Sequence, residues 1–202
     1  GVTCAKVARV SAKQGLTGVE FLAGIPGSIG GALAMNAGAF GGETWDHVAA
    51  VETIDRSGQL HTRTSEQFRT AYRTVVGAAD EWFVAARLSL EHGDSEQAQA
   101  KIRGLLAQRA ASQPTDQFSC GSVFRNPPGD HAARLIEAAG LKGKTLGGAQ
   151  VSPKHANFIV NTGDASAADI ETLLIQVQGR VEQLYGVRLE TEVRIVGEHA
   201  AT

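Results

Sequence analysis

An uncharged, glycine-rich run, residues 21–42 with the sequence FLAGIPGSIGGALAMNAGAFGG, constrains this chain more than any other segment. Seven of its residues are glycine. Glycine removes the side chains that would hold a flat or phosphorylated molecule away from backbone N–H groups. Pro26 stiffens the middle of the run, and Asn36 adds one amide side chain. The run therefore indicates a backbone surface that lies against a ligand.

Three other interpretations of this run compete with a ligand surface. A transmembrane helix fits the length and the lack of charge, and Gly27 and Gly31 form a small-xxx-small pair. The run is only weakly hydrophobic, however, and no Lys/Arg cluster flanks it, so a membrane helix is disfavoured. The glycine spacing fits neither the dinucleotide-binding fingerprint nor the P-loop. A tight turn followed by a close-packed helix stays open.

Composition narrows the class of protein. The 202 residues, 43% of them apolar, are enough for one large domain or two small ones. A formal charge of −2 disfavours nucleic acid and anionic membranes as partners. Two cysteines and the lack of a signal peptide predict a cytoplasmic protein. The six histidines have no metal-ligand spacing, so no metal site is expected.

Hydrophobic periodicity and capping signals predict a mixture of helices and strands. Thr3 is the expected cap of the first helix, in which Val7 and Val10 are expected to face inward. Residues 55–58 have the composition of a hairpin turn, and Ser166 and Asp169 form an expected capping box. Because strands and helices do not alternate regularly, the fold class expected is α+β, with a boundary near residue 93. The expected elements are helices over residues 3–14, 65–69, 95–111, 130–139 and 166–186, and strands over residues 48–55, 59–64, 81–90, 151–161 and 187–196.

Three residues are candidates for chemistry, each with an ordinary structural alternative. Ser122 lies between a glycine and two prolines, which suits a hydroxyl presented on a loop, although a turn residue is the commoner role. Cys120 and Phe124 stand where a hydrolase nucleophile elbow needs glycine, so serine hydrolysis is disfavoured. Arg73 can grip a carboxylate or phosphate, or lie exposed on the surface. Glu192 lies on the polar face of the expected last strand.

Five segments, taken in order, resemble one family. That family is the UDP-N-acetylenolpyruvoylglucosamine reductases, also called UDP-N-acetylmuramate dehydrogenases, which are flavoenzymes of peptidoglycan synthesis. The resemblance runs from about Gly1 to Gly197. The segments are GVEFLAGIPGSIGGALAMNAGAFGGE, AYRT, SCGSVFRNPPGDHAARLIEAAGLKG, GGAQVSPKHANFIVN and LETEVRIVG.

The resemblance implies a fold and a reaction. Residues 1–93 are expected to form the second lobe of an FAD-binding domain of the PCMH/vanillyl-alcohol-oxidase type, and residues 94–202 a C-terminal α+β substrate-binding domain. The implied reaction is the NADPH-dependent, FAD-mediated reduction of UDP-N-acetylenolpyruvoylglucosamine to UDP-N-acetylmuramate. Arg73 matches the arginine at the substrate carboxylate, Ser122 the general acid, and Glu192 the carboxylate that completes the site. A small-molecule substrate is expected, and no protein partner is implied.

The resemblance also implies binding residues. Between Arg73 and the helix expected from residue 95 no long insertion occurs, as in the family branch without an extra tyrosine-bearing loop. The uridine diphosphate part of the substrate is expected at Asn126, Lys142 and His155. The residues expected to contact FAD are Gly24, Ile25, Pro26, Gly27, Ser28, Ile29, Gly30, Gly31, Asn36, Ala37, Gly38 and Arg194.

The first lobe of the family, with its Gly-Ser-Asn loop around the FAD pyrophosphate, has no counterpart in this sequence. We therefore expect a longer gene that encodes this lobe. Hydrogen bonds to a charged group contribute about 1.5–3 kcal/mol each, so the chain alone is expected to bind FAD more weakly by several kcal/mol. The alternative is a non-catalytic remnant that binds the UDP-sugar and cannot hold FAD alone.

Overall fold

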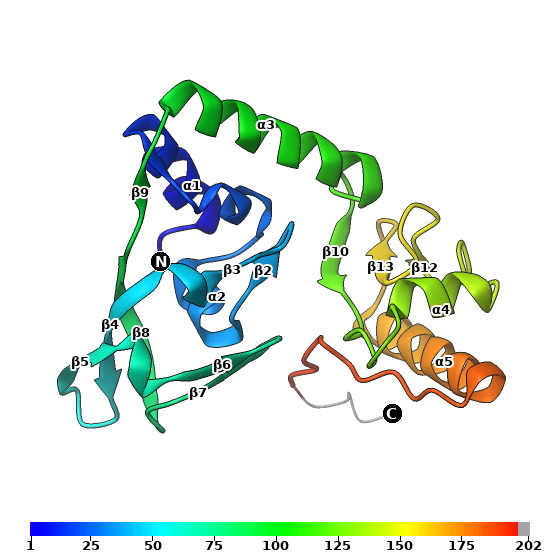
Figure 1. The fold of residues 1–202 in the computed structure, drawn as a ribbon. Helices are drawn as coiled ribbons and strands as arrows, with labels where there is room; N and C mark the ends of the chain where they lie inside the picture. Colours follow the sequence, from blue (N-terminus) through cyan, green and yellow to red (C-terminus); the bar gives the residue numbers. More distant parts are fainter. Residues whose placement is uncertain (198–202) are drawn as a thin grey trace. The chain divides into compact units, whose positions relative to one another are not determined.

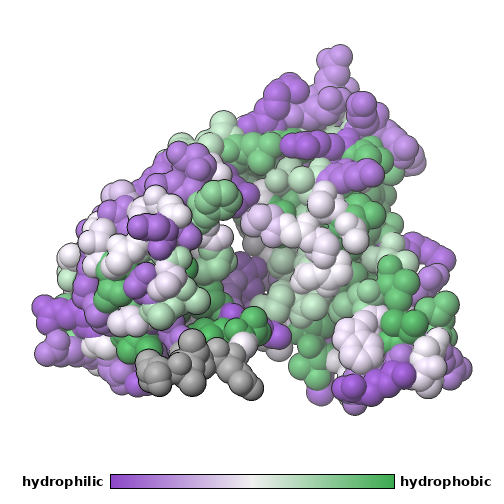
Figure 2. All heavy atoms as spheres, turned by 180° about the vertical axis from the view of Figure 1, so that it is seen from behind, coloured by the Kyte–Doolittle hydropathy of each residue, from purple (hydrophilic) through white to green (hydrophobic). Residues whose placement is uncertain are grey.

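The computed structural model describes residues 1–197, which divide into two compact units, Gly1–Arg109 and the part that begins at Ala110. Both units combine helices with antiparallel sheets, which confirms the α+β class (Figure 1). On the face in Figure 2, hydrophobic and hydrophilic residues are interspersed over the surface. No helix among residues 1–197 is both long enough and apolar enough to cross a bilayer.

The first helix of unit 1, α1 (Cys4–Lys13), begins at the expected cap. The Thr3 side chain accepts a hydrogen bond from the N–H of Lys6, and the chain leaves the helix at Gly15, whose φ is +67°. The prediction that Val10 faces inward is wrong, because its side chain is 46% exposed. The inward face is instead made of small residues that recur every three or four positions: Cys4, Ala8, Ser11 and Ala12.

The glycine-rich run forms short elements instead of one long helix. A 3-10 helix, η1 (Glu20–Gly24), packs on α1 and leads into α2 (Ile29–Met35). Asn36 ends α2 in the left-handed conformation, with φ 42°. The run continues through a two-stranded ribbon of β2 (Gly38–Ala39) and β3 (Gly42–Glu43).

A three-stranded antiparallel sheet, in the order β5-β4-β8, forms the other half of unit 1. Its strands confirm the expected hairpin and the strand that begins at Glu81. They are β4 (Val48–Asp55), β5 (Leu60–Thr64) and β8 (Glu81–Leu88). The remaining short elements of the unit are β1 (Leu16–Thr17), η2 (Thr44–His47) and β9 (Glu91–His92).

The helix expected over residues 65–69 is wrong. One 3-10 turn, η3 (Ser65–Gln67), stands there, and the chain then enters the hairpin of β6 (Arg69–Ala71) and β7 (Thr74–Val76). The reason lies in Phe68, whose backbone is extended and whose ring stacks at 4.6 Å from the ring of Trp45. Burial of this ring against Trp45 ends the helical turn.

We expected the chain to divide after residue 93, whereas the contacts divide it after Arg109. Most of α3 (Ser95–Ser112) therefore belongs to unit 1. Its buried residues Ala98 and Ile102 lie in the same hydrophobic cluster as the inward face of α1. The Lys101 ammonium also donates to the carboxylate of Glu20 in η1, at 3.1 Å. Packing therefore overrides the break in sequence pattern at residue 93.

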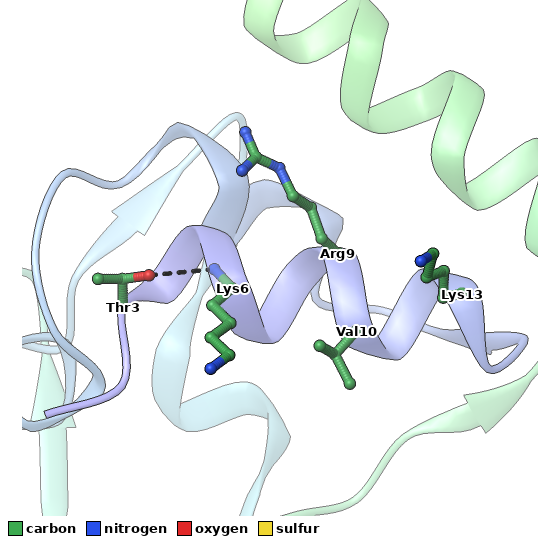
Figure 3. A pocket seen from close by; sticks show the side chains of 5 residues that line it. All are labelled: Thr3, Lys6, Arg9, Val10 and Lys13. Atoms are coloured by element: carbon green, nitrogen blue, oxygen red, sulfur yellow. Dashed lines mark hydrogen bonds between the residues drawn. The ribbon is translucent and has the colours of Figure 1, made fainter.

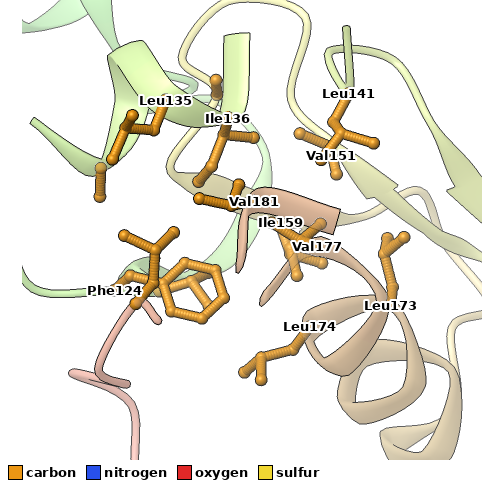
Figure 4. Packing of buried hydrophobic residues seen from close by; sticks show 14 of the residues in the cluster. Phe124, Leu135, Ile136, Leu141, Val151, Ile159, Leu173, Leu174, Val177 and Val181 are labelled. Carbon is orange, nitrogen blue, oxygen red and sulfur yellow. The ribbon is translucent and has the colours of Figure 1, made fainter. Parts of the chain in front are cut away.

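Unit 2 is a four-stranded antiparallel sheet in the order β10-β13-β12-β11, packed against two helices. The longer helix confirms the expected capping box, in which Ser166 and Asp169 exchange hydrogen bonds, and it ends at the left-handed Gly186. In Figure 4, Leu173 and Leu174 of this helix lie in the same cluster as Phe124 and Ile159. The elements are β10 (Phe118–Ser122), α4 (Ala132–Ala138), β11 (Thr145–Leu146), β12 (Ala149–Val151), β13 (Phe158–Asn161) and α5 (Ala167–Tyr185).

Two expected strands of unit 2 differ. The strand expected over residues 151–161 is present only as the last residue of β12 and as β13, because Ser152 turns the chain between them by accepting the N–H groups of Lys154 and His155. The strand expected over residues 187–196 is reduced, within the described residues, to one isolated bridge between Phe124 and Thr191.

Candidate functional site

Residues 26–31, here called the glycine cradle, have the properties of a ligand surface made of backbone. Gly27 has a φ of +151°, and a Cβ built on it meets nothing within 4 Å. A Cβ on Gly30 or Gly31 meets only the Ser28 hydroxyl, at 3.9 and 3.7 Å. Packing within the described chain therefore does not require glycine at positions 30 and 31. Bare backbone beside open space fits a group such as FAD, whose phosphates accept hydrogen bonds from N–H groups.

The cradle is fixed by backbone pairing with the start of α1. The N–H of Cys4 donates to the carbonyl of Gly27 at 3.0 Å, and the N–H of Ile29 donates to the carbonyl of Val2 at 2.9 Å. The Ser28 hydroxyl accepts the N–H of Gly31 at 3.2 Å. Within residues 1–197, the N–H groups of Gly27 and Gly30 have no hydrogen-bond acceptor. These two donors are available to a ligand.

The other glycines expected at the cofactor serve packing. A Cβ on Gly24 would lie 2.6 Å from the ring of Phe40, and one on Gly38 would lie 2.7 Å from the carbonyl oxygen of Gly42. Gly24 is also buried. Contacts inside the chain explain why glycine stands at positions 24 and 38. The glycine cradle is therefore limited to residues 26–31.

Asn36, also expected at the cofactor, has a side chain occupied inside the protein. It is 1% exposed. Its amide NH2 donates to the Glu43 carboxylate at 2.7 Å and to the Ala71 carbonyl at 3.3 Å, and its oxygen accepts the N–H of Trp45 at 3.1 Å. A role for the Asn36 side chain in ligand contact is therefore not supported. The contact with Ala71 instead ties β6 to the end of α2.

Arg73 occupies the turn of the hairpin that Asn36 anchors. Ala71 pairs with Thr74, so Tyr72 and Arg73 are the two turn residues. Arg73 has a left-handed φ of 53°, which costs an ordinary side chain about 1–2 kcal/mol. Its guanidinium lies 5.3 Å from the centre of the Tyr72 ring. Such strain concentrates at functional positions, which fits a cation held for a ligand.

Ser122 ends β10 in unit 2, next to an irregularity in the sheet. Pairing with β13 shifts between Ser119 and Ser122, and Gly121 in between has a φ of +83°. A bulge of this kind redirects the side chain that follows. Ser122 is half-buried, and the next two residues, Val123 and Phe124, are among the most deeply buried of the unit.

The backbone of Glu192 is bonded to Val123, the residue that follows Ser122. The N–H groups of Glu192 and Val193 both donate to the carbonyl of Val123, at 2.8 and 3.4 Å. Glu192 is half-buried, whereas Arg194 is exposed. The backbone segments that carry Ser122 and Glu192 therefore both connect to the buried Val123.

Two of the three residues expected at the uridine diphosphate come together. Burial is the main cause that lowers the pKa of the half-buried His155 imidazole, and the Lys142 ammonium lowers this pKa further while the Glu137 carboxylate raises it. Lys142 pairs with Glu137 at 2.8 Å. His155 and Lys142 are thus within electrostatic range of one another. Asn126 caps α4, because its side-chain oxygen accepts the N–H of Ala132 at 3.1 Å.

Sequence reasoning missed Asn157. This side chain is 4% exposed, and it forms two hydrogen bonds with the backbone of Phe124, 33 residues away. No local pattern predicts such a contact. A signal was present, however, because an amide between the apolar residues Ala156 and Phe158 needs hydrogen-bond partners if it is buried.

A hollow of about 430 Å³ on the outer face of α1 is lined by none of the expected site residues. Figure 3 shows its lining, with the Thr3 side chain accepting the N–H of Lys6. The lining residues are Thr3, Lys6, Arg9, Val10 and Lys13. Among residues 1–197 no cluster of three potential metal ligands exists.

Comparisons with known proteins agree with this division of the chain. The family described as "FAD binding domain" matches residues 1–64, and the family described as "UDP-N-acetylenolpyruvoylglucosamine reductase, C-terminal domain" matches residues 113–196. Together these matches define a flavoprotein-type architecture, an FAD-binding segment followed by a reductase C-terminal domain.

Full-length relatives and a solved structure extend this result. UDP-N-acetylenolpyruvoylglucosamine reductases from Alkalilimnicola ehrlichii and Methylococcus capsulatus are 62% and 63% identical over 98% and 100% of this chain. The crystal structure of the enzyme from Thermus caldophilus matches with a TM-score of 0.85 and 36% identity, over 95% of this chain and 68% of that one. The chain belongs to the UDP-N-acetylenolpyruvoylglucosamine reductase family. It spans 66% of the length of the first two relatives, just under two thirds.

Proposed function

We propose that the protein carrying this chain reduces UDP-N-acetylenolpyruvoylglucosamine to UDP-N-acetylmuramate, with NADPH as reductant and FAD as bound cofactor, in peptidoglycan precursor synthesis. The observation that carries the proposal is the backbone bond that joins Glu192 to Val123, the residue directly after Ser122. Family membership supports the same reaction. The two cysteines are free thiols, which supports a reducing, cytoplasmic location.

The glycine cradle would hold the cofactor through its backbone. Gly27 and Gly30 each offer an N–H group, and the open space above Gly31 admits a ligand atom. Arg194 would lie near the flavin ring. When bound, FAD supplies the hydride that NADPH provides for the enol carbon of the substrate. Because relatives are longer than this chain, the cradle is proposed as one part of the cofactor site.

The substrate would be oriented by its charges. Arg73 would bind the enolpyruvyl carboxylate with its planar fork of donors. That interaction strengthens as negative charge develops toward the carboxylate, and so it favours the transition state over the ground state. The Lys142 ammonium and the neutral, hydrogen-bonding His155 would bind the uridine diphosphate, and Asn126 would bind it with its free amide NH2.

Ser122 would deliver the proton. Its hydroxyl would protonate the carbon next to the substrate carboxylate, while the hydride would add to the terminal enol carbon. A serine hydroxyl is intrinsically a very weak acid, so it needs a group that stabilises or reprotonates its oxygen. The backbone N–H of Glu192 donates to the carbonyl of Val123, the residue after Ser122. We therefore assign the Glu192 carboxylate to complete the site.

A half-reaction assay tests the proposal. Purified protein would be titrated with FAD, then with NADPH, and then with UDP-N-acetylenolpyruvoylglucosamine. We expect NADPH to bleach the flavin absorbance and the enolpyruvyl substrate to restore it. Ser122→Ala should slow only the restoration, by about 10²-fold or more, on the scale of general-acid effects. Ser119→Ala, an exposed serine of the same strand, is the control.

The outcome separates this function from the non-catalytic alternative. Substrate binding without restored absorbance, in protein extended to the length of its relatives, would support a UDP-sugar-binding remnant and overturn the reductase proposal. Tight FAD binding by residues 1–202 alone would show that the cradle suffices without the first lobe.

A further inference from the structure

We infer that Asn157 is a positioning residue that sets the geometry of proton delivery by Ser122. The inference rests on the proposed function, since it assigns Ser122 as the proton donor. It concerns a buried side chain that bonds to the backbone of Phe124, two residues after Ser122, and to none of the residues expected at the substrate or the cofactor.

The side chain and the backbone carbonyl of Asn157 all bond to the two residues that follow Ser122. Its side-chain oxygen accepts the N–H of Phe124 at 3.0 Å, and its NH2 group donates to the carbonyl of Phe124 at 2.8 Å. Its backbone carbonyl accepts the N–H of Val123 at 2.9 Å. Three hydrogen bonds from one buried residue therefore fix the two residues that follow Ser122.

The need for this clamp follows from the irregular sheet. Pairing of β10 and β13 is irregular between Ser119 and Ser122, and its last pair is Ser122 with Phe158. Beyond this pair, the N–H of Val123 donates to the backbone carbonyl of Asn157. The Asn157 side chain extends this connection to Phe124, so it fixes the path of the chain directly after Ser122.

The clamp also reaches Glu192. The carbonyl of Val123 accepts the N–H of Glu192 at 2.8 Å, while the N–H of Val123 donates to the backbone carbonyl of Asn157, which the side-chain bonds to Phe124 hold in place. The backbones of Ser122 and Glu192 therefore both connect to Val123. A displacement of Val123 would move both groups relative to the substrate.

On its other side, Asn157 is linked to the expected diphosphate contact. Its own N–H donates to Nδ1 of His155 at 3.3 Å, which fixes the ring as an acceptor at this nitrogen. The ring of His155 also packs edge-on against Phe158, at 4.9 Å between centres. One residue therefore joins the position of the diphosphate contact to the position of the proton donor.

The test compares Asn157→Ala with Asn161→Ala in protein of the full length of its relatives. Asn161 is a matched control, because its side-chain oxygen also accepts two backbone N–H groups, from Gly163 and Ala165, at the opposite end of β13. We expect Asn157→Ala to slow the substrate-dependent restoration of flavin absorbance on the order of 10-fold to 100-fold, the scale of a misplaced reacting group, with kcat affected more than KM. Bleaching by NADPH should be unchanged in both variants.

A second readout needs neither cofactor nor substrate. Amide hydrogen exchange of the 202-residue chain should accelerate about 10-fold or more at residues 122–125 and 190–193 in Asn157→Ala, and not in Asn161→Ala. Asn157→Asp keeps the acceptor for Phe124 and removes the donor, so it should give an intermediate effect and serves if the alanine variant does not fold.

The outcomes are distinguishable. Absence of substrate-dependent restoration in the unmodified protein would overturn the proposed function. Restoration there, with equal rates and equal exchange in the Asn157 and Asn161 variants, would overturn the positioning role alone.

Discussion

At the scale of single residues, glycines of one sequence run have two different causes. Gly24 and Gly38 are glycine because a neighbouring ring or carbonyl occupies the space of a side chain. Gly30 and Gly31 face open space, so nothing within the described chain forbids alanine there. The FAD affinity of variants at positions 30 and 31 therefore tests whether the cofactor lies against these two glycines.

Gly30→Ala and Gly31→Ala should separate folding from binding. Alanine in α2 should raise the free energy of unfolding by up to about 0.5–1 kcal/mol, because the unfolded chain loses backbone freedom. The added methyl group should weaken FAD binding about 10-fold, which corresponds to about 1.4 kcal/mol. Urea unfolding and flavin titration measure the two effects.

Gly104→Ala in α3 is the control for these variants, since a Cβ there also meets nothing within 4 Å. It should stabilise the chain without altering flavin affinity. Unchanged affinity in the Gly30 and Gly31 variants would contradict the assignment of the cradle to FAD.

His155 should make stability depend on pH. Its folded pKa is lowered, mainly by burial, below the ordinary value of about 6.5. Below about pH 6.5, the His155 imidazole is protonated more readily in the unfolded state than in the folded state. The contribution of neutral His155 to the free energy of unfolding is therefore present above about pH 6.5 and is lost as the pH falls through the folded pKa. Protonation of Nδ1 would also break the hydrogen bond from Asn157.

The check is urea unfolding at pH values on either side of about 6.5. His155→Asn, whose amide oxygen can accept the same bond without titrating, should lose less stability on acidification than the unmodified chain. His92→Asn, on the exposed strand β9, should behave like the unmodified chain. An equal loss in all three proteins would refute the role of His155.

Residue features that depend on local order can be predicted from sequence, whereas contacts with distant residues cannot. Ser122 and Glu192 are assigned through the resemblance, and the structure bonds the backbone of Glu192 to Val123, the residue after Ser122. The hydrogen-bond partners of Asn36 and Asn157 could not be predicted, because Ala71 and Phe124 lie 35 and 33 residues away. Single-sequence patterns carry no information about such partners.

At the scale of elements, predictions succeeded where an element carries its own end signals. The capping box and Gly186 bound α5, and Thr3 begins α1. The strands over residues 151–161 and 187–196 were misjudged, because strand boundaries depend on pairing partners. A strand exists only where another backbone completes its ladder.

Asn36 should control the hairpin that presents Arg73. Asn36→Gly keeps the left-handed backbone and removes the side-chain bonds, which should cost about 1–3 kcal/mol because the N–H of Trp45 is left unpaired. Asn36→Ala should cost about 1 kcal/mol more, owing to its φ of 42°. Amide exchange at residues 69–76 should rise in both variants.

Asp55→Ala provides the comparison for the hairpin. The Asp55 carboxylate accepts the N–H groups of Ser57 and Gln59 in the β4–β5 turn. Its loss should raise exchange in that turn and leave residues 69–76 unchanged. If exchange at residues 69–76 also stays unchanged in the Asn36 variants, Asn36 does not anchor the hairpin.

At the scale of the whole molecule, the chain has separate hydrophobic cores in its two units. One buried cluster contains Leu22 of unit 1 and another contains Leu173 of unit 2. The boundary between the units could not be placed from sequence, because α3 continues through it. The burial of Ala98 and Ile102 decides that most of α3 belongs to unit 1.

Calorimetry should resolve two unfolding transitions. Leu173→Ala should lower the stability of unit 2 by about 2–5 kcal/mol through a cavity in its core, and Leu22→Ala should do the same to unit 1. Each variant should shift one transition and spare the other. A single transition that both variants shift equally would show that the units unfold together.

The conformation of Gly27 has a consequence for how this protein can change over generations. Residues with a side chain rarely adopt a φ of +151°, so the backbone conformation itself favours glycine at position 27. No contact within the described chain requires glycine at positions 30 and 31, so under the proposed function only the bound ligand constrains them. A lineage that abandoned the cofactor should therefore accumulate alanine or serine at positions 30 and 31 and retain glycine at 27, which leaves a readable record of lost chemistry.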